Sequence, residues 1–117
     1  MSAKLLEASV RQLNGTAIID LRGDIDGTAE HALNAAYAEA TASNPTSVLL
    51  NFSGVEYLNS TGIALIVSVL AQARKAKRHL STFGLSDHYI EIFQITRLAD
   101  FMGIYPDEAS ALSHEAR

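Results

Sequence analysis

The chain has 117 residues, of which 48% are hydrophobic and 19% charged, a composition typical of a compact soluble domain with a real core. It contains no cysteine, which excludes disulfide bonds and zinc–thiolate sites. The formal net charge of −4 argues against general affinity for nucleic acid, which normally depends on clustered Lys and Arg.

The sequence predicts a β-hairpin at its start. Asn14 and Gly15 both tolerate positive φ and separate two predicted strands, residues 4–13 and 16–22. We expect Gly23 to end the second strand and Thr28 to cap a helix from about residue 29 to 42.

Short apolar strands then alternate with helices. A strand buried on both faces, residues 47–52, precedes a loop over 53–59. The remaining predicted elements are a helix over 60–77, a strand over 80–83, a helix over 87–96, a strand over 101–105 and a terminal helix over 107–115. This order predicts an α/β fold in a single domain, residues 1–117, with a mixed sheet of about five strands and about four helices packed over it.

Targeting and membrane segments are not expected. The N-terminal residues have no long apolar core and no cleavage site, so we predict no signal peptide. The longest apolar stretch, residues 62–71, is too short to cross a bilayer. We therefore expect a cytoplasmic protein with no direct membrane or nucleic-acid partner.

Most residues that could form a metal, cofactor or catalytic site are better explained by structural roles. The four histidines are widely scattered, and neither a GxxxxGK[ST] nor a GxSxG pattern occurs, so we expect no metal, no cofactor and no enzymatic activity. The basic run at residues 74–78 is interpreted as a solvated helix end favoured by the helix dipole. Asp24 and Asp26 flank Ile25, which we expect to face inward. They are therefore interpreted as part of a solvated strand end that presents its carboxylates to a partner.

The segment Asn-Ser-Thr-Gly at residues 59–62 is less easily explained. Asn59 is a good N-cap, which would leave the hydroxyl of Ser60 at the first helical position and facing solvent. Gly62 costs about 1 kcal/mol relative to alanine inside a helix, so it requires a reason such as close backbone packing or room for a partner. A phosphate on Ser60 would lie at the positive end of the helix dipole. The residues alone leave a capping role and a phosphorylation switch both open.

A resemblance decides between these interpretations. The segment LLNFSGVEYLNSTGIALI resembles the signature of the STAS domain in anti-sigma factor antagonists, in which [D/N]-S-[S/T]-G opens a helix after a buried strand. GDIDGTAE resembles the family's segment before the first helix, and LSTFGLSDHYIEIFQITRLADFMGIYPDEASAL resembles its closing elements. The resemblance covers nearly the whole chain in unchanged order. Asn59 stands where many members carry Asp.

The resemblance implies a phosphorylation switch. Ser60 matches the residue that a partner kinase, itself the anti-sigma factor, phosphorylates, and Thr61 is the second choice. The unphosphorylated antagonist would capture this anti-sigma factor, phosphorylation would end the capture, and a PP2C-type phosphatase would reset it. The expected partner-binding residues are Asp24, Asp26, Asn59, Ser60, Thr61, Gly62 and Ile63, in a monomer or weak dimer.

Two other binding functions share this fold. One is a signalling scaffold in which oligomerisation matters more than sigma factor release. The other is the STAS subunit of a lipid-transport complex that binds an ATPase constitutively. A kinase or phosphatase encoded nearby would favour the switch over both.

Overall fold

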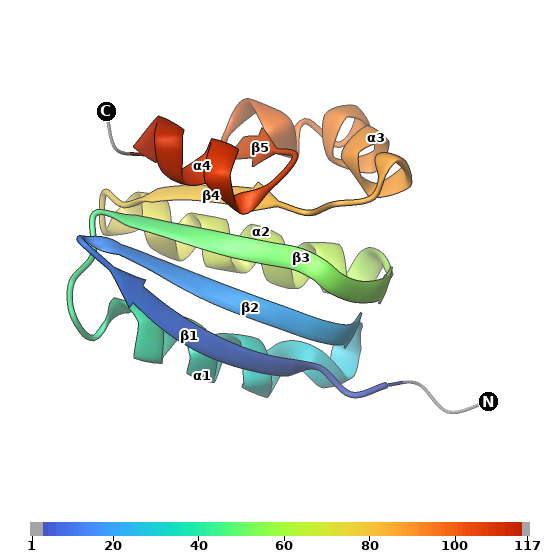
Figure 1. Cartoon of the computed structure of the whole chain (residues 1–117). Coiled ribbons are helices and arrows are strands. Elements are labelled where there is room, and N and C mark those ends of the chain that lie inside the picture. The colour runs from blue at the N-terminus through green and yellow to red at the C-terminus, as the bar shows by residue number, and fades with distance from the viewer. Residues whose placement is uncertain (1–3, 116–117) are drawn as a thin grey trace.

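The computed structural model describes residues 4–115 and contains one five-stranded sheet, in which the strands follow one another in chain order from β1 to β5. β1 is antiparallel to β2, and the other neighbours are parallel (Figure 1). The strands are β1 (Glu7–Leu13), β2 (Thr16–Ile25), β3 (Ser47–Leu58), β4 (His79–Phe83) and β5 (Gly103–Tyr105). The helices are α1 (Glu30–Thr41), α2 (Ser60–Lys75), α3 (Asp87–Ile95) and α4 (Glu108–Glu115), with 3-10 helices at Gly27–Ala29 and Leu98–Asp100. The predicted mixed sheet and helices are confirmed.

The first two strands form the predicted hairpin. Asn14 and Gly15 have φ values of 41° and 85°, the left-handed region that a two-residue turn of this kind requires. The turn places β1 at the edge of the sheet, so that β2 has a partner on each side.

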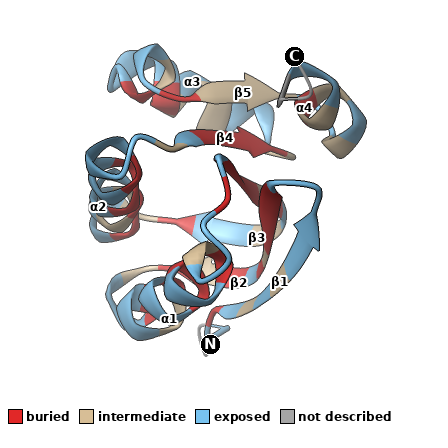
Figure 2. Ribbon diagram, turned by 90° about the vertical axis from the view of Figure 1, so that its left-hand side faces the viewer, coloured by how far each residue is buried: buried red, intermediate tan, exposed pale blue. Residues whose placement is uncertain are grey.

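The two faces of the sheet are covered unequally. α1 and α2 lie on one face and α4 on the other, as the view in Figure 2 shows. Ile19 and Leu50 point to the first face and belong to the main core, whereas Ile18 and Leu49 pack with Ala111 of α4 on the second. The middle of β3 is therefore buried on both sides, as its apolar sequence predicted.

The strands that lead to α2 extend further than the sequence indicated. β2 does not end at Gly23 but continues to Ile25, and β3 continues to Leu58 instead of giving way to a loop after Phe52. The extension exists because the two strands pair again beyond an irregularity, as in the register of Ile25 with Leu58. Gly23 has a φ of 107°, and a Cβ there would lie 2.7 Å from the carbonyl oxygen of Leu5, so glycine lets the strand continue beside the N-terminal segment.

The predicted cap of α1 is wrong. Ala29 stands before α1 and makes no side-chain cap, whereas Asp26 caps the 3-10 helix that precedes it, with its Oδ1 2.9 Å from the nitrogen of Thr28. The Thr28 hydroxyl instead donates to the same oxygen at 2.6 Å. The resulting 3-10 helix precedes α1, which begins at Glu30.

An ion-pair network crosses the second face of the sheet. Arg11 of β1 contacts Asp20 of β2 and Glu108 of α4, each at 2.7 Å, and Asn51 of β3 donates to Asp20 at 2.8 Å. The hydrogen bond from Arg11 lowers the pKa of Asp20 and outweighs the opposing effect of partial burial. The network joins three strands to α4.

We predict that this network makes stability depend on pH. The pKa of Asp20 is lower in the folded state than in the unfolded chain. Its contribution to the free energy of unfolding is therefore complete above about pH 5 and is lost as the pH falls through the lowered pKa. Asp20→Asn should lower the free energy of unfolding by about 1–2 kcal/mol at pH 7. Urea denaturation at several pH values should also show that the variant loses less stability in acid than the natural chain does. Glu39→Gln, which removes an exposed carboxylate of α1, is the control. If the stability of the two variants depended on pH equally, Asp20 would not be a cause of the loss of stability in acid.

Candidate functional site

The start of α2 is fixed by its predicted cap. The Asn59 side-chain Oδ1 accepts a hydrogen bond from the backbone nitrogen of Gly62 at 2.9 Å, while the backbone of Asn59 is extended. This arrangement satisfies one of the free N–H groups of the first turn. Ser60 is therefore the first helical residue, as the sequence predicted.

The two hydroxyl residues face outward. Ser60 and Thr61 are both exposed, and within residues 4–115 neither hydroxyl makes a hydrogen bond. The backbone nitrogens of the first helical turn lie at the positive end of the α2 dipole. The Ser60 hydroxyl is thus accessible and unused by the fold.

Gly62 is required by close backbone packing. A Cβ at this position would overlap the carbonyl oxygen of Ile25, the last residue of β2, and would lie 2.7 Å from its carbonyl carbon. The nitrogen of Asn59 also donates to that oxygen at 3.3 Å. Gly62 is buried, so its part in the site is to bring α2 against the end of β2.

This packing brings the acidic residues to the same place. Asp24 and Asp26 lie on either side of the buried Ile25, and Gly27 lies beside Thr61, whose Cγ2 is 3.7 Å from where a Gly27 Cβ would be. We refer to residues 24–27 as the acidic turn. The predicted partner-binding residues of the turn and of the start of α2 are thus neighbours in space.

Both carboxylates also have structural partners. Hydrogen bonds from the Thr28 side chain and backbone lower the pKa of Asp26, which keeps this half-exposed group ionised. An Asp24 oxygen accepts from the backbone nitrogen of Lys4 at 3.2 Å, and the Lys4 ammonium pairs with Glu56 at 2.7 Å. The turn therefore combines negative charge with a fixed conformation.

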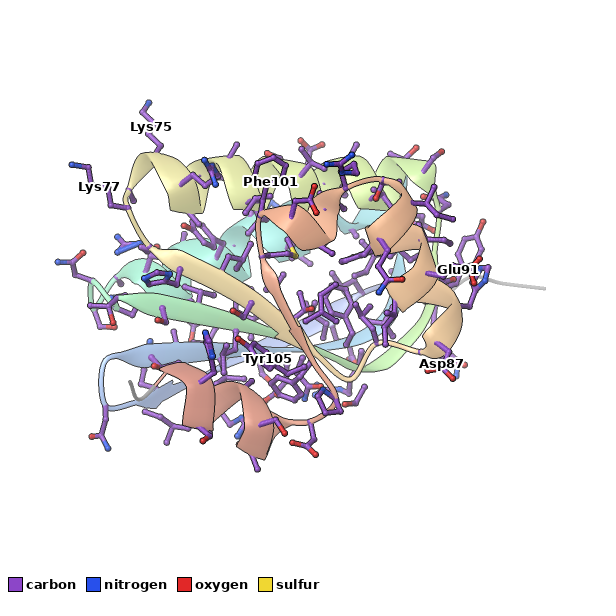
Figure 3. All side chains as sticks on the ribbon, turned by 90° about the horizontal axis from the view of Figure 1, so that it is seen from above. Lys75, Lys77, Asp87, Glu91, Phe101 and Tyr105 are labelled. Carbon is purple, nitrogen blue, oxygen red and sulfur yellow. The ribbon has the colours of Figure 1, made fainter. Side chains whose placement is uncertain are left out.

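Sequence reasoning missed the contribution of α3. The hydroxyl of Tyr89 accepts a hydrogen bond from the backbone nitrogen of Leu58 at 2.9 Å, directly before Asn59. Asp87 and Glu91 of the same helix lie at this end of the molecule, far from Lys75 and Lys77 (Figure 3). Nothing in the sequence of α3 points to β3, because the contact spans 31 residues.

The predicted site residues therefore differ in accessibility. Ser60 and Thr61 are exposed, whereas Asn59 and Ile63 are half-buried. Among residues 4–115, no group of three or more His, Asp or Glu side chains is arranged to hold a metal ion. Across the same residues, none of the helices has the length and apolar character needed to cross a bilayer. The arrangement offers an exposed hydroxyl beside an acidic surface.

We predict that capping and charge at Asn59 can be separated. Asn59→Ala should cost about 1 kcal/mol because the Gly62 nitrogen loses its acceptor. Asn59→Asp should stay within about 0.5 kcal/mol of the natural chain, since Asp caps equally well and gains slightly from the helix dipole. Urea denaturation of the three proteins measures both effects. A large loss in Asn59→Asp would show that the amide nitrogen also has a structural role.

Proteins of similar sequence are named as regulators. The chain is 33% identical over 63 residues to the anti-sigma-F factor antagonist RsfB of Mycobacterium tuberculosis, a match that covers 54% of this chain and 52% of RsfB. The chain thus spans about half the length of the curated relatives it matches first.

Solved structures share the fold. An anti-sigma factor antagonist from Mycobacterium paratuberculosis superposes with a TM-score of 0.80 at 21% identity, over 93% of this chain and 92% of that one. The Bacillus cell fate determinant SpoIIAA in its phosphorylated form gives 0.69 at 19% identity, over 92% of this chain and 97% of that one. A family model described as "Mlab, STAS domain" matches residues 8–105, from β1 to the end of β5. The chain therefore belongs to the STAS domain family.

Proposed function

We propose that this protein is an anti-sigma factor antagonist switched by phosphorylation of Ser60. It captures an anti-sigma factor that is also a serine kinase, releases it once Ser60 is phosphorylated, and is reset by a PP2C-type phosphatase. The supporting observation is the exposed, unbonded Ser60 hydroxyl at the start of α2, beside the acidic turn. The names of its relatives support the same general role.

The switch would act through charge. A phosphate adds about −1.5 to −2 charges at neutral pH, at the helix start whose next two residues lie against the acidic turn. The positive end of α2 accommodates this anion within the protein. A partner surface matched to the unphosphorylated loop would instead meet an uncompensated charge.

The acidic turn is proposed as the second part of the partner surface. Asp24 and Asp26 are held in place by Lys4 and Thr28 and so present their charges without further ordering. A partner with basic groups at matching positions would associate faster because of this charge.

Mass spectrometry tests the phosphoacceptor. After incubation with the cognate kinase and Mg-ATP, we expect one phosphate on the natural chain and on Thr61→Ala, and none on Ser60→Ala. Thr61→Ala is a matched control because it removes the neighbouring exposed hydroxyl. Phosphate that persists on Ser60→Ala and disappears from Thr61→Ala would move the site to Thr61.

A constitutive STAS subunit of a transport or scaffold complex is the second candidate. The description of the family model that matches residues 8–105, "Mlab, STAS domain", mentions no sigma factor and fits this function as well as the switch. This function does not require a modified Ser60. A complex whose affinity is the same before and after kinase treatment would support it over the switch.

A further inference from the structure

A cavity of about 700 Å³ lies at the end of the sheet opposite Ser60. It opens where β5 is too short to cover β4. β5 begins opposite Ser81, so the first two residues of β4, His79 and Leu80, have no partner in β5. The volume falls within the range of about 300–1,000 Å³ that is usual for small-molecule sites.

Charged and aromatic side chains from distant segments meet around this cavity. They come from the end of α2 and the turn after it, the start of β4, the segment before β5, β5 itself and α4. The lining residues that matter here are Arg74, Arg78, His79, Phe101, Tyr105 and His114. Figure 3 labels Phe101 and Tyr105 near the middle of the molecule, above and below the sheet in that view, and Lys75 and Lys77 at one end.

Among the side chains that the structure describes, the cations at this end have no carboxylate partner. Within residues 4–114, the four cations of the segment 74–78 form no ion pair, whereas every other Lys and Arg does. The paired ones are Lys4 with Glu56, Arg11 with Asp20, Arg22 with Glu7, and Arg97 with Asp100. Asp100 is the carboxylate among the lining residues, and its contact with Arg97 at 2.6 Å already engages it.

The two guanidinium groups are held in position. One nitrogen of Arg78, Nη1, donates to the Asn44 side chain and to the Pro45 carbonyl, both at 3.0 Å. Its Nε is buried and has no hydrogen-bond partner among the described residues. The guanidinium carbon of Arg74 lies 5.2 Å from the centre of the Phe101 ring. Segment 74–78 is the exposed helix end that its sequence indicated, and its two arginines have these contacts in addition.

We propose that this cavity binds a small organic anion that carries a phosphate group and an aromatic ring. Guanidinium groups carry a permanent positive charge and donate charge-assisted hydrogen bonds to phosphate oxygens, and two of them line the cavity with two imidazoles. The ring would lie against Phe101, which is 54% exposed, or against the neighbouring rings of Tyr105 and His114, whose centroids are 5.2 Å apart and whose planes are inclined by 39°. α2 spans about 24 Å between this cavity and Ser60, so the proposal is independent of the switch.

Phenyl phosphate is the probe that combines both features. In titration calorimetry and ¹⁵N chemical-shift mapping, we expect saturable binding with shifts at His79, Ser81 and Gly103 and none at residues 59–62. Phenol should not bind, and inorganic phosphate should bind at least threefold more weakly, since each lacks one of the two features. No saturation by about 10 mM phenyl phosphate, or shifts centred on residues 59–62, would overturn the proposal.

Charge-matched variants locate the site. Arg74→Gln and Arg78→Gln should each weaken phenyl phosphate about tenfold, the effect of losing a charged hydrogen bond. Arg22→Gln removes the same charge outside the cavity and should leave the affinity unchanged. Equal loss in all three variants would mean non-specific attraction and would overturn the proposal. Binding to phosphatidylglycerol vesicles, with no binding of phenyl phosphate, would overturn it in favour of a membrane surface.

Discussion

Replacing Gly62 with alanine should destabilise the protein by about 3 kcal/mol, although alanine is the better helix former by about 1 kcal/mol. The added Cβ would overlap the carbonyl oxygen of Ile25, and that oxygen also accepts a hydrogen bond from Asn59. Relief of the overlap must either break this hydrogen bond or move α2 away from β2. Urea denaturation followed by circular dichroism measures the loss.

Gly27→Ala is the matched control. Its Cβ would meet only the Thr61 Cγ2, at 3.7 Å, which is an ordinary van der Waals distance. We expect a change of less than about 1 kcal/mol from this substitution. If the Gly62 and Gly27 variants were equally stable, the close approach of α2 to β2 would not limit the residue at position 62.

Replacing Ser60 with aspartate should weaken capture of the anti-sigma factor at least a hundredfold, or about 2.7 kcal/mol. The substitution places a permanent charge at the exposed start of α2, where a partner surface matched to the neutral serine would leave that charge uncompensated. Ser60→Ala should bind as tightly as the unphosphorylated chain and should not respond to the kinase. Titration calorimetry on purified proteins gives both affinities.

Ser113→Asp controls for charge alone. Ser113 is exposed on α4, on the opposite face of the sheet from α1 and α2. It should leave the affinity unchanged. If Ser60→Asp and Ser60→Ala bound equally well, phosphorylation could not act by charge and the electrostatic switch would be wrong.

The elements that depend on local chemistry could be predicted from the sequence. The Asn14–Gly15 turn needs positive φ at both positions, and Asn59 caps α2 through a bond to a residue three positions away. Such features are determined by neighbours in the chain, so their residue types are sufficient. The alternation of apolar strands with helices likewise predicted the mixed sheet.

Features that depend on distant segments could not be predicted. The second half of β3 is a strand only because β2 pairs with it beyond the irregularity, which its own polar residues do not indicate. The sequence suggested two reasons for Gly62, and only the position of Ile25 shows that close packing is the cause. Thr28 has the residue type of a cap, but its backbone N–H and its hydroxyl both donate to Asp26.

The positions of the charged side chains labelled in Figure 3 predict an electric dipole along the sheet. The chain carries a net charge of −4, yet Lys75 and Lys77 mark one end, while Asp87 and Glu91 mark the other (Figure 3). A basic partner in solution would exert a torque on this dipole and turn the Ser60 end toward itself before contact. A phosphate on Ser60 would enlarge the dipole and bring the net charge to about −6. Modification would thus alter which way the protein faces in a partner's field as well as how tightly it binds.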